Sequence, residues 1–210
     1  MISQVHLGYE SNSTMNPGKS TYELRFFDLI FLAAEISAAL WVHIHFFETT
    51  LRTLIFDVLR IEYKSESWWL TSELLTNRDL VAISLTERRL KRQGRRITPF
   101  LIANNMSLSF WVELLGFRYY KKVWVHLEKV IPNYSGKREI FYEKSREIRN
   151  LRNSIAHHGP ILRRNLLRDL TYLNELTSLL NPTLAIEVEK RSRALELIQN
   201  AQLVGSGGGI

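Results

Sequence analysis

The chain has 210 residues, of which 45% are hydrophobic and 23% charged, the composition of an ordinary globular protein with one sizeable core. It contains no cysteine, which excludes a disulfide framework, a thiolate metal site and a cysteine nucleophile. The formal net charge of +7 favours a polyanionic partner, nucleic acid first and an anionic membrane surface second.

The N-terminal part divides into a polar lead and a long apolar segment. Residues 1–20 are rich in Ser, Asn and Gly, so we expect a flexible lead without the apolar core of a signal peptide, in a cytoplasmic protein. Residues 22–63 contain neither Gly nor Pro, which predicts one very long helix, or two joined at a kink, with Ser20 or Thr21 as its cap.

The most apolar stretch of this segment, residues 26–47, also has the length of a membrane span. It carries Asp28, Glu35, His43 and His45, and a charge near the middle of a span costs at least about 2.5 kcal/mol. Because its apolar residues occupy several helix faces, we expect other helices to bury it and predict no membrane contact.

Glu48 and Arg52 lie four residues apart on the same predicted helix. They suit a simple intrahelical ion pair, worth roughly 0.2–0.5 kcal/mol. Alternatively, Glu48 orients a residue of a functional site elsewhere through a charge-assisted hydrogen bond.

Shorter helices are expected in the middle of the chain. Their predicted limits are 74–93, ended by Gly94; Thr98–Pro99 to Ala103; a helix capped by Ser107 or Ser109 and broken at Gly116; and 117–130, a further helix or a bent extension, followed by a loop at 132–136. The aromatic residues of segment 117–130 could stack on bases, but their helical spacing favours core positions for most of them: Phe117, Tyr119, Tyr120 and Trp124.

Basic residues gather at the end of segment 74–93, namely Arg88, Arg89, Lys91, Arg92, Arg95 and Arg96, and a second group follows residue 160, namely Arg163, Arg164 and Arg168. A solvated helix end explains the first group through the helix dipole. A polyanionic partner explains both groups through contacts to backbone phosphates.

Segment 138–157 is predicted to be a helix with one apolar and one polar face, ended by Gly159–Pro160. At roughly 100° per residue, one stripe holds Ile148, Leu151 and Ile155. The opposite stripe, with Arg152 on its flank, holds Arg146, Arg149, Asn153 and His157.

The rest of the chain continues the helical pattern. Residues 161–180 and 184–203 form two further predicted helices separated by Asn181–Pro182, and the Gly-rich residues 204–210 are a flexible tail or linker. No stretch alternates with period two, so residues 21–203 are predicted to form one all-α domain.

Two interpretations of the polar stripe compete. It is the solvated face of an amphipathic helix, or Arg152 and His157 act together on a phosphodiester. Imidazole both accepts and donates a proton near neutral pH, and the guanidinium fork matches phosphate oxygens. Cleavage through the 2′-hydroxyl needs a proton acceptor and a proton donor, which a two-fold dimer supplies as two copies of His157.

Three segments carry a resemblance to a known family. Arg152-Asn153-Ser154-Ile155-Ala156-His157 resembles the R-x4-6-H motif of the HEPN superfamily, and residues 149–161 are similar to the signature of its Abi-like (abortive infection) branch. Residues 46–55 resemble the E-x-x-L-R segment of that branch. Residues 106–115 resemble its S/T-F-x-F-W block, with Ser109 where Gly is common.

This resemblance implies a HEPN-type helical bundle with additional helices, and a metal-independent endoribonuclease of antiphage defence with a composite site at a homodimer interface. In this family His157 would accept and donate protons, Arg152 would supply positive charge to the phosphate, and Asn153 would hold the geometry of the site by hydrogen bonding. Glu48 and Arg52 would be supporting residues. RNA contacts are expected from Arg146, Arg149, His158, Arg163, Arg164, Arg92, Arg95 and Arg96.

Other functions remain open at this stage. The chain could bind RNA without cutting it, paired with a small non-coding RNA, or regulate another protein through the polar stripe. No cofactor or metal is expected, because His43 and His45 lie on different sides of a helix and His157 and His158 diverge in the same way.

Overall fold

The computed structural model describes the backbone of residues 17–131, 134 and 136–206, and the side chains of 27–131, 134 and 136–202. The α-helices are α1 (Pro17–Glu62), α2 (Asn77–Arg92), α3 (Pro99–Asn105), α4 (Leu108–Glu113), α5 (Val125–Leu127), α6 (Arg138–Ala156), α7 (Leu166–Leu180), α8 (Pro182–Arg191) and α9 (Ala194–Ser206). Short helical turns occupy η1 (Trp68–Leu70), η2 (Phe117–Tyr119), η3 (Tyr120–Trp124) and η4 (Ile161–Arg163). Every regular element in these residues is helical, which confirms the all-α class.

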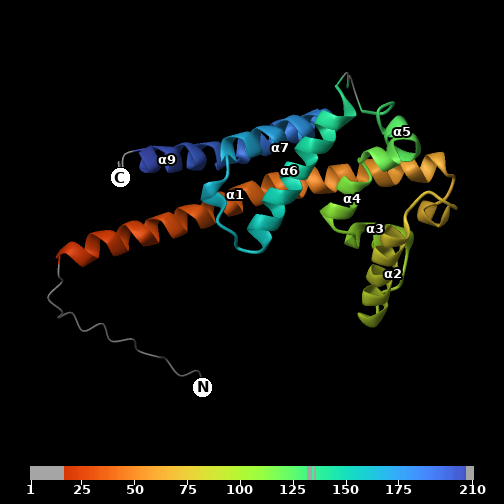
Figure 1. Ribbon diagram of the computed structural model, residues 1–210, viewed down its shortest axis with the longest axis horizontal. Helices are drawn as coiled ribbons and strands as arrows, with labels where there is room; N and C mark the ends of the chain where they lie inside the picture. The colour runs from red at the N-terminus through yellow and green to blue at the C-terminus, as the bar shows by residue number, and fades with distance from the viewer. Residues whose placement is uncertain (1–16, 132–133, 135, 207–210) are drawn as a thin grey trace.

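Helix α1 is the axis of the molecule. It contains 46 residues and is therefore about 69 Å long. Helices α4, α5, α6, α7 and α9 all pack against it, and in Figure 1 α6 crosses it while α2 and α3 lie at one side of its C-terminal half. The predicted long helix is thus continuous, but it begins at Pro17 rather than near Tyr22, so part of the expected lead is helical. The rest of that lead (1–16), part of the loop at 132–136 and the end of the tail (207–210) lie outside the described residues.

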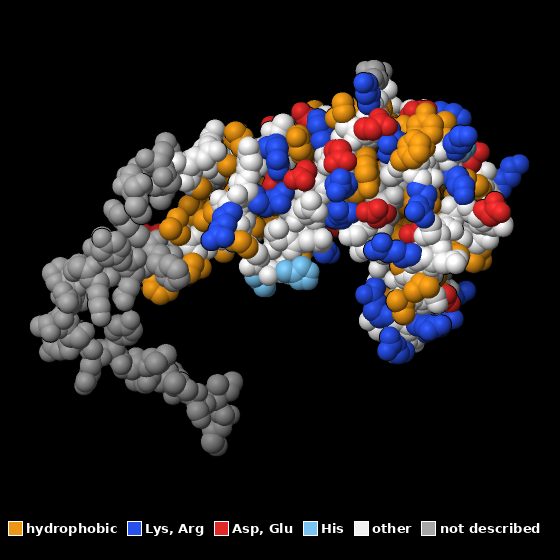
Figure 2. Space-filling model, in the orientation of Figure 1, with side chains coloured by type: hydrophobic (Ala, Val, Ile, Leu, Met, Phe, Trp, Pro, Cys, Tyr) orange, Lys and Arg blue, Asp and Glu red, His pale blue; other side chains and the backbone are white. Residues whose placement is uncertain are grey.

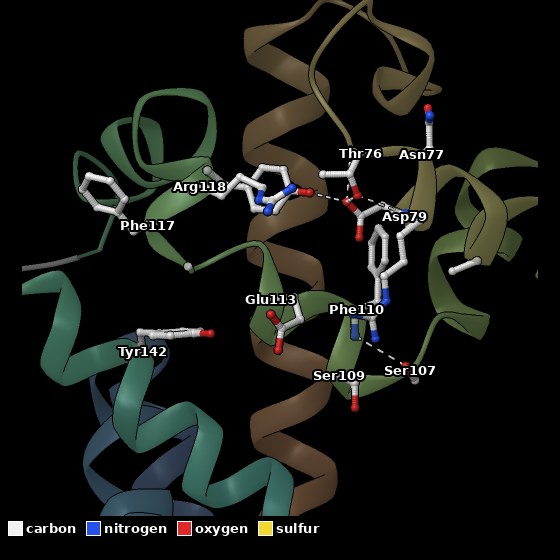
Figure 3. Close-up of a pocket in the computed structure, with 14 residues that line it drawn as sticks. Thr76, Asn77, Asp79, Ser107, Ser109, Phe110, Glu113, Phe117, Arg118 and Tyr142 are labelled. Atoms are coloured by element: carbon white, nitrogen blue, oxygen red, sulfur yellow. Dashed lines mark hydrogen bonds between the residues drawn. The ribbon is translucent and has the colours of Figure 1, made fainter.

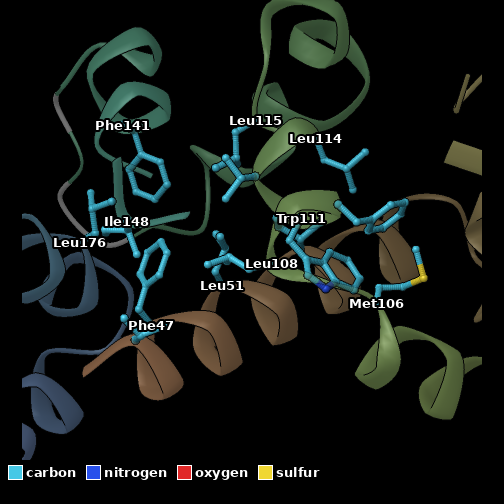
Figure 4. Close-up of a cluster of buried hydrophobic side chains, with 14 of the residues drawn as sticks. Phe47, Leu51, Met106, Leu108, Trp111, Leu114, Leu115, Phe141, Ile148 and Leu176 are labelled. Carbon is cyan, nitrogen blue, oxygen red and sulfur yellow. The ribbon is translucent and has the colours of Figure 1, made fainter. Parts of the chain in front are cut away.

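The core forms on one stripe of α1. Its fully buried members recur every three or four residues, as helix geometry requires: Ile36, Leu40, Ile44, Phe47, Leu51, Ile55 and Leu59. Figure 4 shows Phe47 and Leu51 facing Trp111 of α4 and Ile148 of α6. The apolar stripe of α6 therefore holds this helix on the scaffold, and its polar stripe is directed away from the core.

The N-terminal half of α1 is more exposed than the sequence led us to expect. Between Phe27 and Glu62 the helix is long and apolar enough to span a membrane by length and composition, yet only 22% of its apolar window is buried. A continuous stripe of exposed residues runs along it, which we name the α1 stripe: Phe27, Ile30, Phe31, Ala34, Ala38, Trp41 and Val42. The expectation that other helices bury this segment on several faces is wrong, because α8 and α9 cover α1 from one side only.

The C-terminal region contains two helices where one was expected. Its break lies at Ser192, whose hydroxyl accepts a hydrogen bond from the backbone N–H of Ala194 at 3.1 Å. The same hydroxyl lies 2.7 Å from Nε2 of the buried His43 on α1. Burial lowers the pKa of His43, and Asn174 and Glu189 act in the opposite direction. This polar contact fixes where α8 ends and α9 turns back along α1.

Segment 117–130 takes the second of its two predicted forms, a bent extension. It consists of the turns η2 and η3 followed by the short α5. Tyr119 and Trp124 are core residues, as expected, whereas Phe117 is 80% exposed. An exposed phenylalanine of this size at a bend of the chain lies outside the core packing and is available for contacts.

Candidate functional site

The end of α6 combines a helix stop with the predicted polar residues. The N–H of Gly159 donates to the carbonyl of Ser154 at 2.7 Å, and the N–H of His158 donates to Ile155 at 3.1 Å. These two bonds form a Schellman motif, in which the residue after the cap adopts the left-handed conformation. That residue is His158, with φ of +54°, and not Gly159 as the sequence suggested. His157 is the cap residue itself and is exposed.

The histidine side chains are accessible at the edge of the molecule. In Figure 2 they lie at the lower margin, where α6 ends in Figure 1. The surface is hollowed between this point and α2, and Lys and Arg side chains cover the α2 side of the hollow. A strand of polyanion can therefore approach the end of α6 without displacing another element.

Several arginines around α6 are already neutralised by carboxylates. Arg146 donates to both oxygens of Glu143 at 2.9 and 3.0 Å, and this contact raises the pKa of Arg146. Arg149 pairs with Glu113 of α4 at 2.5 Å. Both guanidinium groups thus have an anionic partner before any ligand binds.

Arg164 serves the fold in the same way. Its Nε donates to the buried carboxylate of Asp169 at 2.7 Å, and its Nη2 lies 3.4 Å from Glu147. Arg168 binds the same two carboxylates, at 3.1 and 2.9 Å. The structure therefore ties Arg164 to the α6–α7 packing, whereas Arg163 is exposed and has no carboxylate partner among the described residues.

Arg152 differs from these neighbours. Within the described part of the chain it has no carboxylate partner, and its only polar side-chain contact is a donation from Nη1 to Oδ1 of Asn153 at 3.4 Å. Its guanidinium carbon lies 5.8 Å from the ring centre of Trp41 on the α1 stripe, a cation–π geometry. Its Nε is buried without a hydrogen-bond acceptor. The Nε atoms of Arg52 and Arg138 are in the same state, so the missing carboxylate partner is what distinguishes Arg152 from its neighbours on α6.

The predicted supporting residues lie on the buried side of the site. Arg52 donates to the backbone oxygen of Asn104 at 3.2 Å and to Thr49 at 3.5 Å, so it connects α1 to the end of α3. Burial lowers the pKa of Arg52, and the charge of Glu48 acts in the opposite direction. Among the described residues, Glu48 forms no hydrogen bond to Arg152 or His157, so its role here is electrostatic.

The basic end of α2 is largely unpaired. Lys91 pairs with Glu87 at 2.6 Å, and Arg89 donates to the backbone oxygen of Asn105 at 3.1 Å. In contrast, no carboxylate in the described residues pairs with the exposed Arg92, Arg95 and Arg96. These three charges remain available to a polyanion, and they lie at or just beyond the C-terminal end of α2, which lies across the hollow from the end of α6.

Two site neighbours were not predictable as such. Trp41 was placed in the core by its apolar character, and Glu113 was seen only as part of the segment resembling the S/T-F-x-F-W block. Their contacts to Arg152 and Arg149 join residues far apart in the chain, and no local pattern marks them. Among the described residues, no group of three or more His, Cys, Asp or Glu side chains is arranged to hold a metal ion.

Comparisons of the chain with protein-family models, with curated proteins and with solved structures found no match.

Proposed function

We propose that this protein is a metal-independent endoribonuclease of the HEPN type, acting in the cytoplasm in antiphage defence, with a composite active site at a homodimer interface. The observation that carries the proposal is the state of Arg152. Its neighbours Arg146 and Arg149 have carboxylate partners, while Arg152 keeps an unmatched charge beside Asn153 and five residues before the exposed His157. Cleavage of a phosphodiester requires positive charge beside the phosphate and a group that transfers protons, and these residues supply both.

The chemistry follows from these groups. The 2′-hydroxyl of the RNA attacks the adjacent phosphorus while one His157 accepts its proton, so the P–O2′ bond forms. The P–O5′ bond then breaks, and a second imidazole donates a proton to the leaving oxygen. The products are a 2′,3′-cyclic phosphate and a 5′-hydroxyl, so protons and atoms balance without a cofactor. Arg152 stabilises the negative charge of the phosphorane, and Asn153 holds its guanidinium in place.

A second copy of the chain supplies the second imidazole in this proposal. The α1 stripe provides an apolar surface for that copy, and the stripe includes Trp41, on whose ring Arg152 rests. Seating two copies on this stripe about a two-fold axis brings each Arg152 to the interface. Burial of the stripe also removes its exposed apolar side chains from water.

The decisive experiment uses labelled single-stranded RNA in the presence of EDTA. We expect cleavage by the native protein and loss of at least roughly a hundredfold in rate for Arg152→Ala and for His157→Ala, because each removes a transition-state contact. The control is Arg60→Ala, which removes an exposed arginine at the C-terminal end of α1 that is assigned to no RNA contact. Cleavage by His157→Ala at the native rate, with unchanged helical content, refutes the assignment.

A second function is supported by the unpaired arginines of α2. Arg92, Arg95 and Arg96 can bind an RNA backbone without any chemistry at α6, as in a protein that pairs with a small non-coding RNA. RNA binding with a steep salt dependence, and no cleavage by the native protein, would favour this function over the nuclease.

A further inference from the structure

A pocket of about 580 Å³ lies beside the polar stripe of α6. Its walls come from the start of α2, from α4, from the bend at η2 and from α6, and Figure 3 shows Tyr142 and Glu113 on facing elements. This volume is within the usual range for small-molecule sites, roughly 300–1,000 Å³. It is large enough for one nucleotide but not for a folded domain.

One wall of the pocket consists of side chains that hydrogen-bond to one another. The carboxylate of Asp79 accepts hydrogen bonds from the backbone N–H and the hydroxyl of Thr76, and Tyr119 donates its hydroxyl to it as well. Burial and this carboxylate together raise the pKa of Tyr119. These groups hold α2 against the bend at η2, and all three bonds go to Oδ2 of Asp79.

The opposite wall retains free binding groups. Glu113 uses Oε1 for Arg149, and its Oε2 has no partner among the described residues. The hydroxyls of Ser109 and Tyr142 and the guanidinium of Arg118 are likewise unengaged in that part of the chain. The pocket thus offers a carboxylate oxygen, hydroxyls and a cation to an incoming ligand.

Two aromatic rings stand at the mouth of the pocket. Phe117 is 80% exposed, and Tyr142 lies near it on α6. The guanidinium of Arg138 lies 5.8 Å from the ring centre of Phe117 and 5.9 Å from that of Tyr142, which fixes both rings relative to each other. The guanidinium of Arg146 also lies 5.6 Å from the ring centre of the half-buried Tyr142, so Phe117 offers the accessible ring on which a single-stranded base can stack.

The pocket is connected to the proposed cleavage site. Glu113 lines the pocket and pairs with Arg149, which lies three residues before Arg152 on α6, about 4.5 Å along the helix axis. A single-stranded RNA whose backbone passes Arg152 therefore has the pocket within reach of a neighbouring nucleotide.

We propose that this pocket binds one unstacked nucleobase of the RNA, and so sets which nucleotide lies beside the cleavage site; this rests on the proposed function. The base stacks on Phe117, and its edge donates to Oε2 of Glu113. Adenine, cytosine and guanine present an exocyclic amine to this carboxylate. Uracil presents a single N–H between two carbonyl oxygens that the carboxylate repels, so it is the disfavoured base.

The test measures binding separately from cleavage. All proteins carry His157→Ala to prevent cutting, and fluorescence anisotropy gives the affinity for oligoadenylate, for oligouridylate and for an abasic ribose–phosphate oligomer of the same length. We expect oligoadenylate to bind tightest. Phe117→Ala should weaken its binding roughly five- to a hundredfold, the range for one lost stacking contact, and leave the abasic oligomer unaffected. Phe100→Ala is the control, since Phe100 is 62% exposed and lies outside the pocket.

Equal affinity for oligoadenylate and the abasic oligomer overturns the pocket assignment, as does a loss in Phe117→Ala no larger than in Phe100→Ala. These outcomes are independent of the nuclease. If the native protein cuts no RNA but binding depends on Phe117, the proposed chemistry fails and the base pocket stands. If it cuts RNA without any effect of Phe117, the reverse holds.

Discussion

The left-handed histidine at the end of α6 gives a prediction that separates stability from catalysis. His158 has φ of +54°, and a residue with a Cβ loses roughly 1–2 kcal/mol in that conformation. In His158→Gly this strain is removed, while the greater freedom of Gly in the unfolded chain costs about 0.5–1 kcal/mol. The net expectation is that the free energy of unfolding rises by about 0.5–1 kcal/mol, or by roughly 1–4 °C in Tm for a chain of this size.

The end of α2 offers a matched control. Gly94 also occupies the left-handed position of a Schellman motif, with φ of +68°, and the N–H of Arg95 donates to the carbonyl of Leu90 at 3.2 Å. A Cβ added at Gly94 meets no atom within 4 Å, so Gly94→Ala introduces backbone strain without a clash. It should destabilise the protein by about as much as His158→Gly stabilises it.

Urea and thermal unfolding followed by circular dichroism test both variants, and RNA cleavage is measured on the same samples. His158→Gly should keep most of the activity, because His157 carries the proton transfer in our assignment. A destabilised His158→Gly variant would show that the left-handed conformation carries no strain. A loss of cleavage as complete as in His157→Ala would move the acid–base role to His158.

Three further predictions concern the packing, the pH dependence and the dimer. Asp169→Ala leaves Arg164 and Arg168 without their buried partner. The free energy of unfolding, measured in urea, should therefore fall by about 2–3 kcal/mol, a value that allows for the partly exposed guanidinium groups. A loss below about 1 kcal/mol contradicts this network of ion pairs. Burial lowers the pKa of His43, so the unfolded chain binds the proton more tightly, and the free energy of unfolding should decrease as pH falls below about 6.5. His43→Gln should weaken this pH dependence. An unchanged slope of the free energy of unfolding against pH would exclude His43 as its source. Trp41→Glu places a charge on the α1 stripe. The variant should sediment as a monomer, keep the native helical content and cut no RNA. A native-like dimer would place the interface elsewhere.

Helix ends were the most predictable part of the fold. Thr98 and Pro99 begin α3 as their types suggest, Gly94 follows α2, and Asn181–Pro182 separates α7 from α8. In each case the determining interaction lies within four residues of the chain, as in the N–H of Leu184 that donates to Asn181 at 3.0 Å. Local sequence is sufficient for such features.

The missed break in the last helix depends on a distant partner. Ser192 interrupts the last helix while its hydroxyl contacts His43 on α1, 149 residues away. Ser192 is neither Gly nor Pro, so the sequence does not indicate that tertiary contacts override the helical pattern there. Segment 117–130, by contrast, follows Gly116, and its bend, where Tyr119 reaches Asp79 on α2, was one of two predicted forms.

The sequence predicts which helix face carries the site residues, but it does not predict which of their charges are neutralised by carboxylates. Helical periodicity places Arg149, Arg152 and His157 on or beside the polar stripe of α6, and the structure keeps them there. Which guanidinium is neutralised depends on Glu113, 36 residues away, and on the packing of α7 against α6. Arg149 and Arg164 therefore differ from Arg152 for reasons that only the tertiary structure supplies.

The position of the site at a helix C-terminus supports the dimer on electrostatic grounds. Phosphates usually bind at helix N-termini, where the dipole is positive, and the C-terminal end of α6 carries the opposite partial charge, roughly half an elementary charge. One copy of Arg152 has to offset this field before it attracts a phosphate, which leaves roughly half an elementary charge at the site. Two copies about a two-fold axis provide two guanidinium groups against two helix ends, so this net charge doubles, and they add a second imidazole at one phosphodiester. An isolated chain should accordingly bind RNA through Arg92, Arg95 and Arg96 and still fail to cut it.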